Sequence, residues 1–214
     1  MQPPSKEKSE HLAVHAIIPC TVTNGPGRRF GLWVQGCGRK CRGCFNPDIQ
    51  PYLEKDAGAF GLSGNSKKPG WIKVGILADH IKKSAKNLDL EGISISGGEP
   101  FEQPEPLYEL IGGLKDDGMS VLIFTGYTLS ELLDEERTRR FFRSEPIVDV
   151  LIDGPFIESM TVNGELRGSS NQEIRLLTDR YAERDLIPPG PVEAVIGPDG
   201  EISYTGFTRT PFSE

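Results

Sequence analysis

The chain has 214 residues, of which 36% are hydrophobic and 26% charged, values typical of a globular protein with one sizeable core. Lys and Arg number 24 against 31 Asp and Glu, giving a net charge of −7, which argues against general nucleic-acid binding and against an anionic membrane surface. No apolar run is long enough to span a bilayer, and the polar start lacks the apolar segment of a secretory signal. We therefore expect a cytoplasmic protein with a flexible tail at 1–12 and a single domain at 13–214.

Strand-like and helix-like segments alternate along the chain. Short apolar runs typical of strands occur at 15–22, 29–36, 92–96, 120–126, 147–154, 173–177 and 192–204, the first two and the last as hairpins. Helical patterns occur at 74–88, 104–118 and 129–144. Residues 51–70 show no period and are predicted to be a loop or insertion. The alternation predicts an α/β fold with a largely parallel sheet, closed or partly closed as a (β/α) barrel.

Three of the four cysteines lie in one short segment, "QGCGRKCRGCFNP". Cys37, Cys41 and Cys44 have the spacing C-x3-C-x2-C, and the intervening glycines let the loop curl so that the thiolates converge. A structural zinc site needs four ligands, whereas a cubane iron–sulfur cluster with three thiolates keeps one iron open for a substrate or cofactor. The spacing favours the open cluster.

Two other interpretations of the cysteines stay open at this point. A zinc site could be completed by Cys20 or by a histidine, although the histidines show no ligand-like spacing with the loop. A redox dithiol would use only two of the three thiols. Cys20 lies in the apolar stretch "IIPCTV", where we expect a free cysteine to be buried as a small hydrophobic residue.

A second signal is "SISGGEP", residues 94–100, directly after a predicted strand. Gly97 and Gly98 allow close backbone approach, and Glu99 adds a carboxylate, so the segment suits a cationic amino group. The alternative is an ordinary tight turn with a solvated glutamate. "TGYT" and "DGPF" also follow strands, which places all three segments at one rim of the sheet.

These segments resemble the radical S-adenosylmethionine enzymes, whose hallmarks are the C-x3-C-x2-C loop and a "GGE" element. The chain is most similar to the small activating enzymes of glycyl-radical enzymes, especially those of anaerobic ribonucleotide reductases. The matching pieces between residues 17 and 172 are "NGPGRRF", "QGC", "CRGCFNP", "SGGEPFEQ", "FTGYT", "LIDGPF" and "LRGSSNQ". The chain departs from the pattern at Gly43, where the superfamily often has an aromatic residue and where Phe45 follows instead, at 56–70, and in a longer tail after Gln172.

The resemblance implies a single [4Fe-4S] cluster on Cys37, Cys41 and Cys44. Its open iron would be chelated by S-adenosylmethionine, which one electron cleaves to a 5′-deoxyadenosyl radical. Gly97, Gly98 and Glu99 would hold the methionine amino group. The full set of cofactor-binding residues implied is Phe45, Gly97, Gly98, Glu99, Pro100, Thr125, Tyr127, Asp153 and Arg167.

The roles implied for the later residues have structural alternatives. Thr125 and Tyr127 would line the nucleoside side of the site. Asp153 would be a rim carboxylate or a residue that caps a turn. Arg167 would meet the S-adenosylmethionine carboxylate or the partner, or would be an ordinary surface arginine. No catalytic residue beyond the cluster is assigned.

The cysteine count limits the source of electrons. Once three cysteines bind one cluster, only Cys20 remains, so no second cluster with four cysteine ligands can be built and electrons must come from an external reductant such as a flavodoxin or ferredoxin. The favoured function is generation of a glycyl radical on a partner such as anaerobic ribonucleotide reductase. The alternatives are a radical enzyme acting directly on a small-molecule or peptide substrate, and a non-catalytic iron–sulfur or zinc module.

Overall fold

The computed structural model describes residues 10–62, 68–188, 190–197, 200 and 202–206, so most of the expected tail at 1–12 lies outside the described residues. The main sheet has seven strands in the order β3-β1-β2-β4-β5-β6-β7. Its strands are β1 (His11–Thr21), β2 (Arg29–Val34), β3 (Gly70–Lys73), β4 (Gly92–Gly97), β5 (Ser120–Phe124), β6 (Val150–Asp153) and β7 (Glu173–Leu176). A second sheet is the hairpin of β8 (Val192–Ile196) and β9 (Ile202–Gly206).

The helices are α2 (Val74–Leu88), α3 (Pro104–Lys115), α4 (Leu129–Asp134) and α5 (Glu136–Arg139). Short 3-10 turns occur at Pro47–Ile49, Pro100–Glu102, Arg140–Phe142, Glu158–Met160 and Glu183–Leu186. In the part of the chain that the structure describes, no helix is long and apolar enough to cross a membrane.

The four central strands β2, β4, β5 and β6 run parallel, as the alternating pattern predicts. The flanks are antiparallel: β1 pairs with β2 and β3, and β7 pairs with β6. The expected largely parallel sheet is therefore confirmed for its centre and not for its edges. Strand β3 begins within the segment expected to be a loop or insertion at 51–70. Its four residues are too few for a readable period, and only their long-range pairing with β1 makes them a strand.

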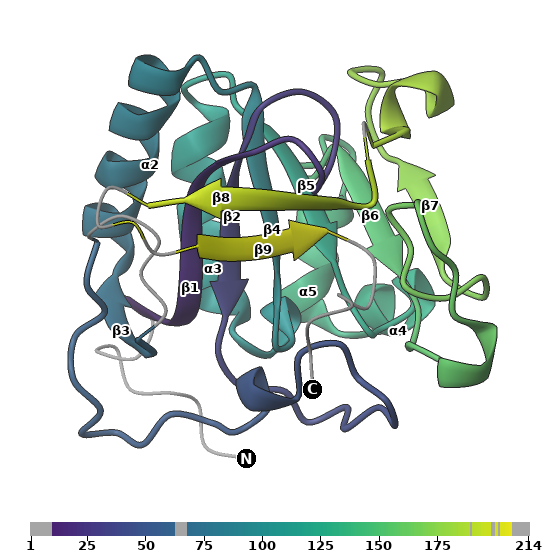
Figure 1. The fold of residues 1–214 in the computed structure, drawn as a ribbon, viewed down its shortest axis with the longest axis horizontal. Coiled ribbons are helices and arrows are strands. Elements are labelled where there is room, and N and C mark those ends of the chain that lie inside the picture. Colours follow the sequence, from purple (N-terminus) through teal and green to yellow (C-terminus); the bar gives the residue numbers. More distant parts are fainter. Residues whose placement is uncertain (1–9, 63–67, 189, 198–199, 201, 207–214) are drawn as a thin grey trace.

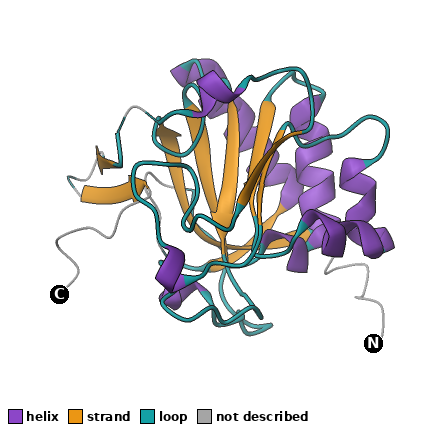
Figure 2. Ribbon diagram, turned by 90° about the vertical axis from the view of Figure 1, so that its right-hand side faces the viewer, coloured by secondary structure: helices purple, strands orange, loops and turns teal. Residues whose placement is uncertain are grey.

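Helices cover one face of the sheet and the β8–β9 hairpin crosses the other (Figures 1 and 2). The hydrophobic core lies under the helices, where α3 buries Leu107, Leu110, Ile111 and Leu114 completely. The predicted helix at 129–144 is broken, because Glu135 is extended (φ −98°, ψ 128°) and separates α4 from α5. Thr128 and Glu131 form a capping box that begins α4.

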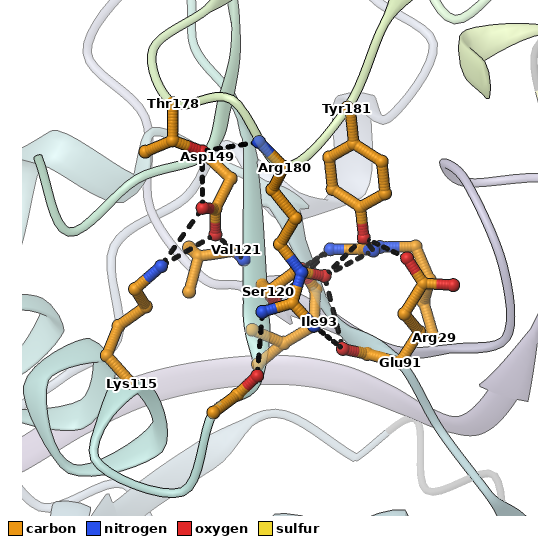
Figure 3. Close-up of polar contacts among 11 residues, drawn as sticks. Arg29, Glu91, Ile93, Lys115, Ser120, Val121, Asp149, Thr178, Arg180 and Tyr181 are labelled. Carbon is orange, nitrogen blue, oxygen red and sulfur yellow. Dashed lines mark hydrogen bonds and ion pairs between the residues drawn. The ribbon is translucent and has the colours of Figure 1, made fainter.

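The amino ends of the parallel strands are joined through one buried arginine (Figure 3). The side chain of Arg29 is fully buried at the start of β2. Its guanidinium donates to Ser94 Oγ at 2.7 Å, to the Ile93 carbonyl at 2.6 Å, to Ser120 Oγ at 2.9 Å and to Tyr181 Oη at 3.2 Å. These hydrogen bonds compensate the cost of burying the charge, and they connect β2, β4, β5 and the segment after β7.

Candidate functional site

The three clustered cysteines line one cavity of about 380 Å³ at the opposite, carboxyl ends of the parallel strands. The cavity lies between the open face of the sheet and the β8–β9 hairpin, and its volume falls in the range of about 300–1,000 Å³ typical of small-molecule sites. Among the residues expected to bind cofactor, five share this wall: Phe45, Gly97, Gly98, Glu99 and Thr125. The chemistry-bearing segments therefore meet at the rim that the strand order predicts.

The cysteine loop leaves β2 and is closed at its base by backbone hydrogen bonds. Gly36 N donates to the Ile49 carbonyl at 2.8 Å, and Cys37 N donates to the Gln50 carbonyl at 2.9 Å. Gly43 has φ +69°, and a Cβ there would lie 2.5 Å from the Glu158 side chain. This left-handed turn explains why glycine occupies the position where an aromatic residue is common in the wider superfamily.

All three thiols are free and partly buried, which suits ligands of a cluster. Burial raises the pKa of the Cys37 thiol, and the nearby Glu99 and Glu102 carboxylates add to this shift. Among the described residues, no group of three His, Cys, Asp or Glu side chains lies close enough to hold one metal ion. The donor set of three thiols on a single cavity fits a cluster in which each thiolate binds a different iron.

Cys20 lies apart from this loop, on β1, and is not among the residues that line the cavity of the three cysteines. The structure therefore gives no support to a zinc site completed by Cys20. Cys20 is also only partly buried, which corrects the expectation of a buried cysteine. Of the histidines, His15 lies on the cavity wall, and its Nδ1 is hydrogen bonded to Gln35 Oε1 at 2.7 Å.

The glycine pair in "SGGEP" joins the β4 loop to the cysteine loop. Gly98 N donates to the Val34 carbonyl and Glu99 N donates to the Gly36 carbonyl, each at 2.8 Å. A Cβ at Gly98 would lie 2.1 Å from the Gly36 oxygen. Gly97 has φ +109°, and a Cβ there would lie 2.5 Å from the Val34 backbone. Only glycine permits this approach, so the pair fixes the distance between the thiols and Glu99.

Glu99 is buried, not solvated, so the alternative of a solvated glutamate in an ordinary turn is wrong. Its side chain is 1% exposed and accepts hydrogen bonds from Phe101 N at 3.1 Å, Thr125 Oγ1 at 2.8 Å and Gly126 N at 2.8 Å. Burial raises its pKa to about 7, although these three donors favour the charged form. A carboxylate kept dry in this way gains most when a cation binds beside it.

Four expected residues do not line the cavity: Pro100, Tyr127, Asp153 and Arg167. Asp153 accepts from Leu129 N at 2.8 Å, at the start of α4, and pairs with Arg175 Nε at 2.6 Å. Arg167 Nε pairs with Glu165 at 2.8 Å. Both side chains thus have the structural contacts that the alternative interpretations describe.

The segments that carry Asp153 and Arg167 reach the cavity through other residues. Phe156, two residues after "DG", stacks against Phe45 with ring centroids 4.9 Å apart, and Gly168 and Gln172 complete this part of the wall. Arg39 also lines the cavity, with its guanidinium 4.6 Å from the centre of the Tyr127 ring and 3.2 Å from Glu131. The sequence did not predict that His15, Arg39 and Phe156 line the cavity. The only signal in the sequence was their position in or beside the recognised motifs.

An α/β sheet brings three free thiols of one loop, and a buried glutamate that follows two glycines, to the same cavity. This arrangement is typical of a class of protein, the iron–sulfur proteins that bind one cluster through a single cysteine loop. Residues 23–175 match the family described as "4Fe-4S single cluster domain", and the chain belongs to this family. The family description confirms the prediction of a single [4Fe-4S] cluster.

Proteins with a more specific description match most of the chain. The anaerobic ribonucleoside-triphosphate reductase-activating protein of Vibrio cholerae is 32% identical over 169 residues, which cover 77% of this chain and 97% of that protein. The proteins of the same description from phage T4 and Escherichia coli are each 28% identical, over 79% and 76% of this chain and 97% of their own lengths. Among solved structures, QueE from Escherichia coli has a TM-score of 0.44 and 21% identity over 55% of this chain and 54% of its own.

Proposed function

We propose that this chain is an activating enzyme that generates a glycyl radical on an anaerobic ribonucleotide reductase. One observation carries the proposal: the three thiols and buried Glu99 line a single cavity, in a chain that spans nearly the whole length of relatives named for activating that reductase. The main sheet then forms a partial (β/α) barrel, supported by the succession of β4, α3, β5, α4 and β6. The proposed setting is the cytoplasm, with a flavodoxin or ferredoxin as electron donor.

The residues divide into those that hold the cluster and those that hold S-adenosylmethionine. Cys37, Cys41 and Cys44 would bind three irons. Glu99 would accept a hydrogen bond from the methionine ammonium, with Thr125 Oγ1 and Gly126 N fixing its carboxylate in place. When bound, the cluster and S-adenosylmethionine supply one-electron cleavage to a 5′-deoxyadenosyl radical, which takes a hydrogen atom from the partner's glycine.

The remaining residues of the cavity wall shape the site and exclude water from it. Phe45 and Phe156 pack together beside the cysteine loop and give this part of the cavity an apolar wall. Excluding water protects a reactive radical from side reactions. For Asp153, Arg167 and Tyr127 we propose supporting roles, since each contacts protein groups that hold the rim together.

The first experiment measures iron. Protein purified without air and reconstituted should hold about four irons per chain in one site. Cys37→Ala, Cys41→Ala and Cys44→Ala should each lose the cluster, while Cys20→Ala, the matched control, should keep it. Stoichiometric zinc in anaerobically produced protein would contradict the proposal.

The second experiment tests the substrate. Reduced protein, S-adenosylmethionine and the anaerobic ribonucleotide reductase of the same organism are mixed, and the spin signal is recorded. A radical centred on glycine should appear, and deuterium placed on that glycine should appear in 5′-deoxyadenosine. If 5′-deoxyadenosine instead forms many times per chain with a small substrate and no partner radical, the enzyme acts on that substrate directly.

A further inference from the structure

The β8–β9 hairpin lies beyond the residues that the family match covers. The match ends at residue 175, whereas the hairpin occupies 192–206 and crosses the open face of the main sheet (Figures 1 and 2). Its residues Ser203, Tyr204, Thr205 and Gly206 line the same cavity as the three cysteines. A segment outside the family match therefore forms part of the wall of the cavity where the radical chemistry would occur.

Polar contacts hold the hairpin against the first strand. Glu193 Oε2 accepts from Thr21 Oγ1 at 2.8 Å and from Val22 N at 2.9 Å. Asn24 Nδ2 donates to Thr205 Oγ1 at 2.7 Å. Two of these contacts involve β8 and one involves β9, so both strands of the hairpin are held against the end of β1 and the residues after it.

Strand β9 is polar on the side that faces the protein, which is the reverse of an ordinary packed strand. In β9, inward-facing Ser203 and Thr205 are 2% and 8% exposed, whereas outward-facing Ile202 and Tyr204 are 48% and 51% exposed. The Ser203 hydroxyl is buried and has no hydrogen-bond partner among the residues that the structure describes. A buried hydroxyl without a partner costs about 1–3 kcal/mol, so its place on the wall of a cavity indicates a ligand that supplies the missing hydrogen bond.

The polar residues around Ser203 on the cavity wall are neutral, unlike Glu99. Asn24 Nδ2 donates to Thr205 Oγ1 at 2.7 Å and to Thr21 Oγ1 at 2.9 Å, so these groups are already used within the protein. The Ser203 hydroxyl is the one of this set that is left for a ligand. A neutral hydroxyl, which both donates and accepts hydrogen bonds, matches a peptide amide.

We propose that Ser203 Oγ hydrogen-bonds a backbone amide of the glycine-bearing segment that the partner inserts into the cavity. The inference rests on the proposed function and deepens it, because it makes the C-terminal hairpin a specificity element for the protein substrate. The hydroxyl has no partner in the described part of the chain and obtains one from the substrate, so that the hairpin orients the inserted segment in the cavity that the thiols line.

The test uses the reconstituted holoenzyme, S-adenosylmethionine at saturation and the full-length reductase at varied concentration. Ser203→Ala should raise the reductase concentration that gives half-maximal radical formation about fivefold, as expected for one neutral hydrogen bond. The maximal rate and the Kd for S-adenosylmethionine should stay within twofold. Ser203→Thr, which keeps the hydroxyl, should restore the wild-type value.

Two controls show whether Ser203→Ala affects recognition of the reductase or the stability of the fold. Ile202→Ala alters the neighbouring outward-facing residue and should leave the half-maximal concentration within twofold of wild type. The melting temperature of Ser203→Ala should be equal to or above that of wild type, since the substitution removes a buried hydroxyl that has no partner in the free protein.

The results that would overturn the role of Ser203 differ from those that would overturn the proposed function. An unchanged half-maximal concentration for Ser203→Ala overturns the inference while wild-type radical formation upholds the proposed function. A Kd for S-adenosylmethionine that rises by the same factor assigns the hydroxyl to the cofactor and also overturns it. If the wild-type enzyme makes no glycyl radical at all, the proposed function itself fails, and the inference with it.

Discussion

Replacing Gly98 by alanine tests whether the two loops of the site are held together as the structure shows. The new Cβ would lie 2.1 Å from the Gly36 carbonyl oxygen, whereas real Cβ atoms essentially never come within 3.0 Å of such a group. The loops must therefore separate by about 1 Å. The two bonds at 2.8 Å that join them, from Gly98 N and Glu99 N, would then exceed hydrogen-bonding distance.

The expected loss of stability follows from these two effects. Two backbone hydrogen bonds contribute about 1 kcal/mol each, and forcing a methyl group into a packed site adds about 1 kcal/mol or more. We expect Gly98→Ala to lower the free energy of unfolding by about 3 kcal/mol. For a chain of this size, that corresponds to a fall in Tm of about 6–12 °C.

The assay is urea unfolding of anaerobically prepared, cluster-free protein, with Gly112→Ala as the matched control. Gly112 lies inside α3, where a Cβ would meet nothing within 4 Å, so the same substitution should stabilise the protein by about 0.5–1 kcal/mol. The change in the free energy of unfolding should therefore have opposite signs in the two variants. A Gly98→Ala protein within 0.5 kcal/mol of wild type would refute the close contact between the loops.

Two further predictions concern buried charges. Arg29→Met should lower the free energy of unfolding, measured in urea, by about 3–5 kcal/mol, because its partners in β4 and β5 lose their donor. Arg28→Met, at an exposed neighbour, should change this free energy by less than about 0.5 kcal/mol, and similar losses in both variants would contradict the network. The pKa of Glu99 is raised from 4.5 to about 7 in the folded protein. As the pH rises from 4.5 to 7, the free energy of unfolding of cluster-free wild type should therefore fall by about 3 kcal/mol relative to that of Glu99→Gln. Parallel pH profiles of the two proteins would show that the pKa of Glu99 is not raised by folding.

Local signals made much of the site predictable. Turn residues and apolar runs identified β1 and β2, so the cysteine loop could be placed at the end of a strand. The rule that parallel strands align their carboxyl ends then placed "SGGEP" beside it, as the hydrogen bonds between the two loops confirm. Each of these inferences needed only neighbouring residues and the direction of the strands.

Contacts between distant segments could not be read in the same way. Asp153 is at the predicted rim, but the sequence did not show that Arg175, 22 residues later, holds its carboxylate. The hairpin at 192–204 was predicted correctly, yet its position over the cavity depends on Glu193 meeting Thr21, 172 residues away. Such pairings are set by tertiary packing, which leaves no period or motif in the sequence.

The hydrogen bonds of Arg29 also bear on how the chain folds. Its guanidinium is satisfied only when β2, β4, β5 and Tyr181 are all in place, and Tyr181 is 152 residues away along the chain. In a partly folded form that lacks the segment after β7, the Arg29 guanidinium would lose its hydrogen bond to Tyr181 while its charge stayed partly removed from water, which costs free energy. The arginine thereby couples the first half of the sheet to its last segment, which disfavours intermediates and makes the loss of structure cooperative.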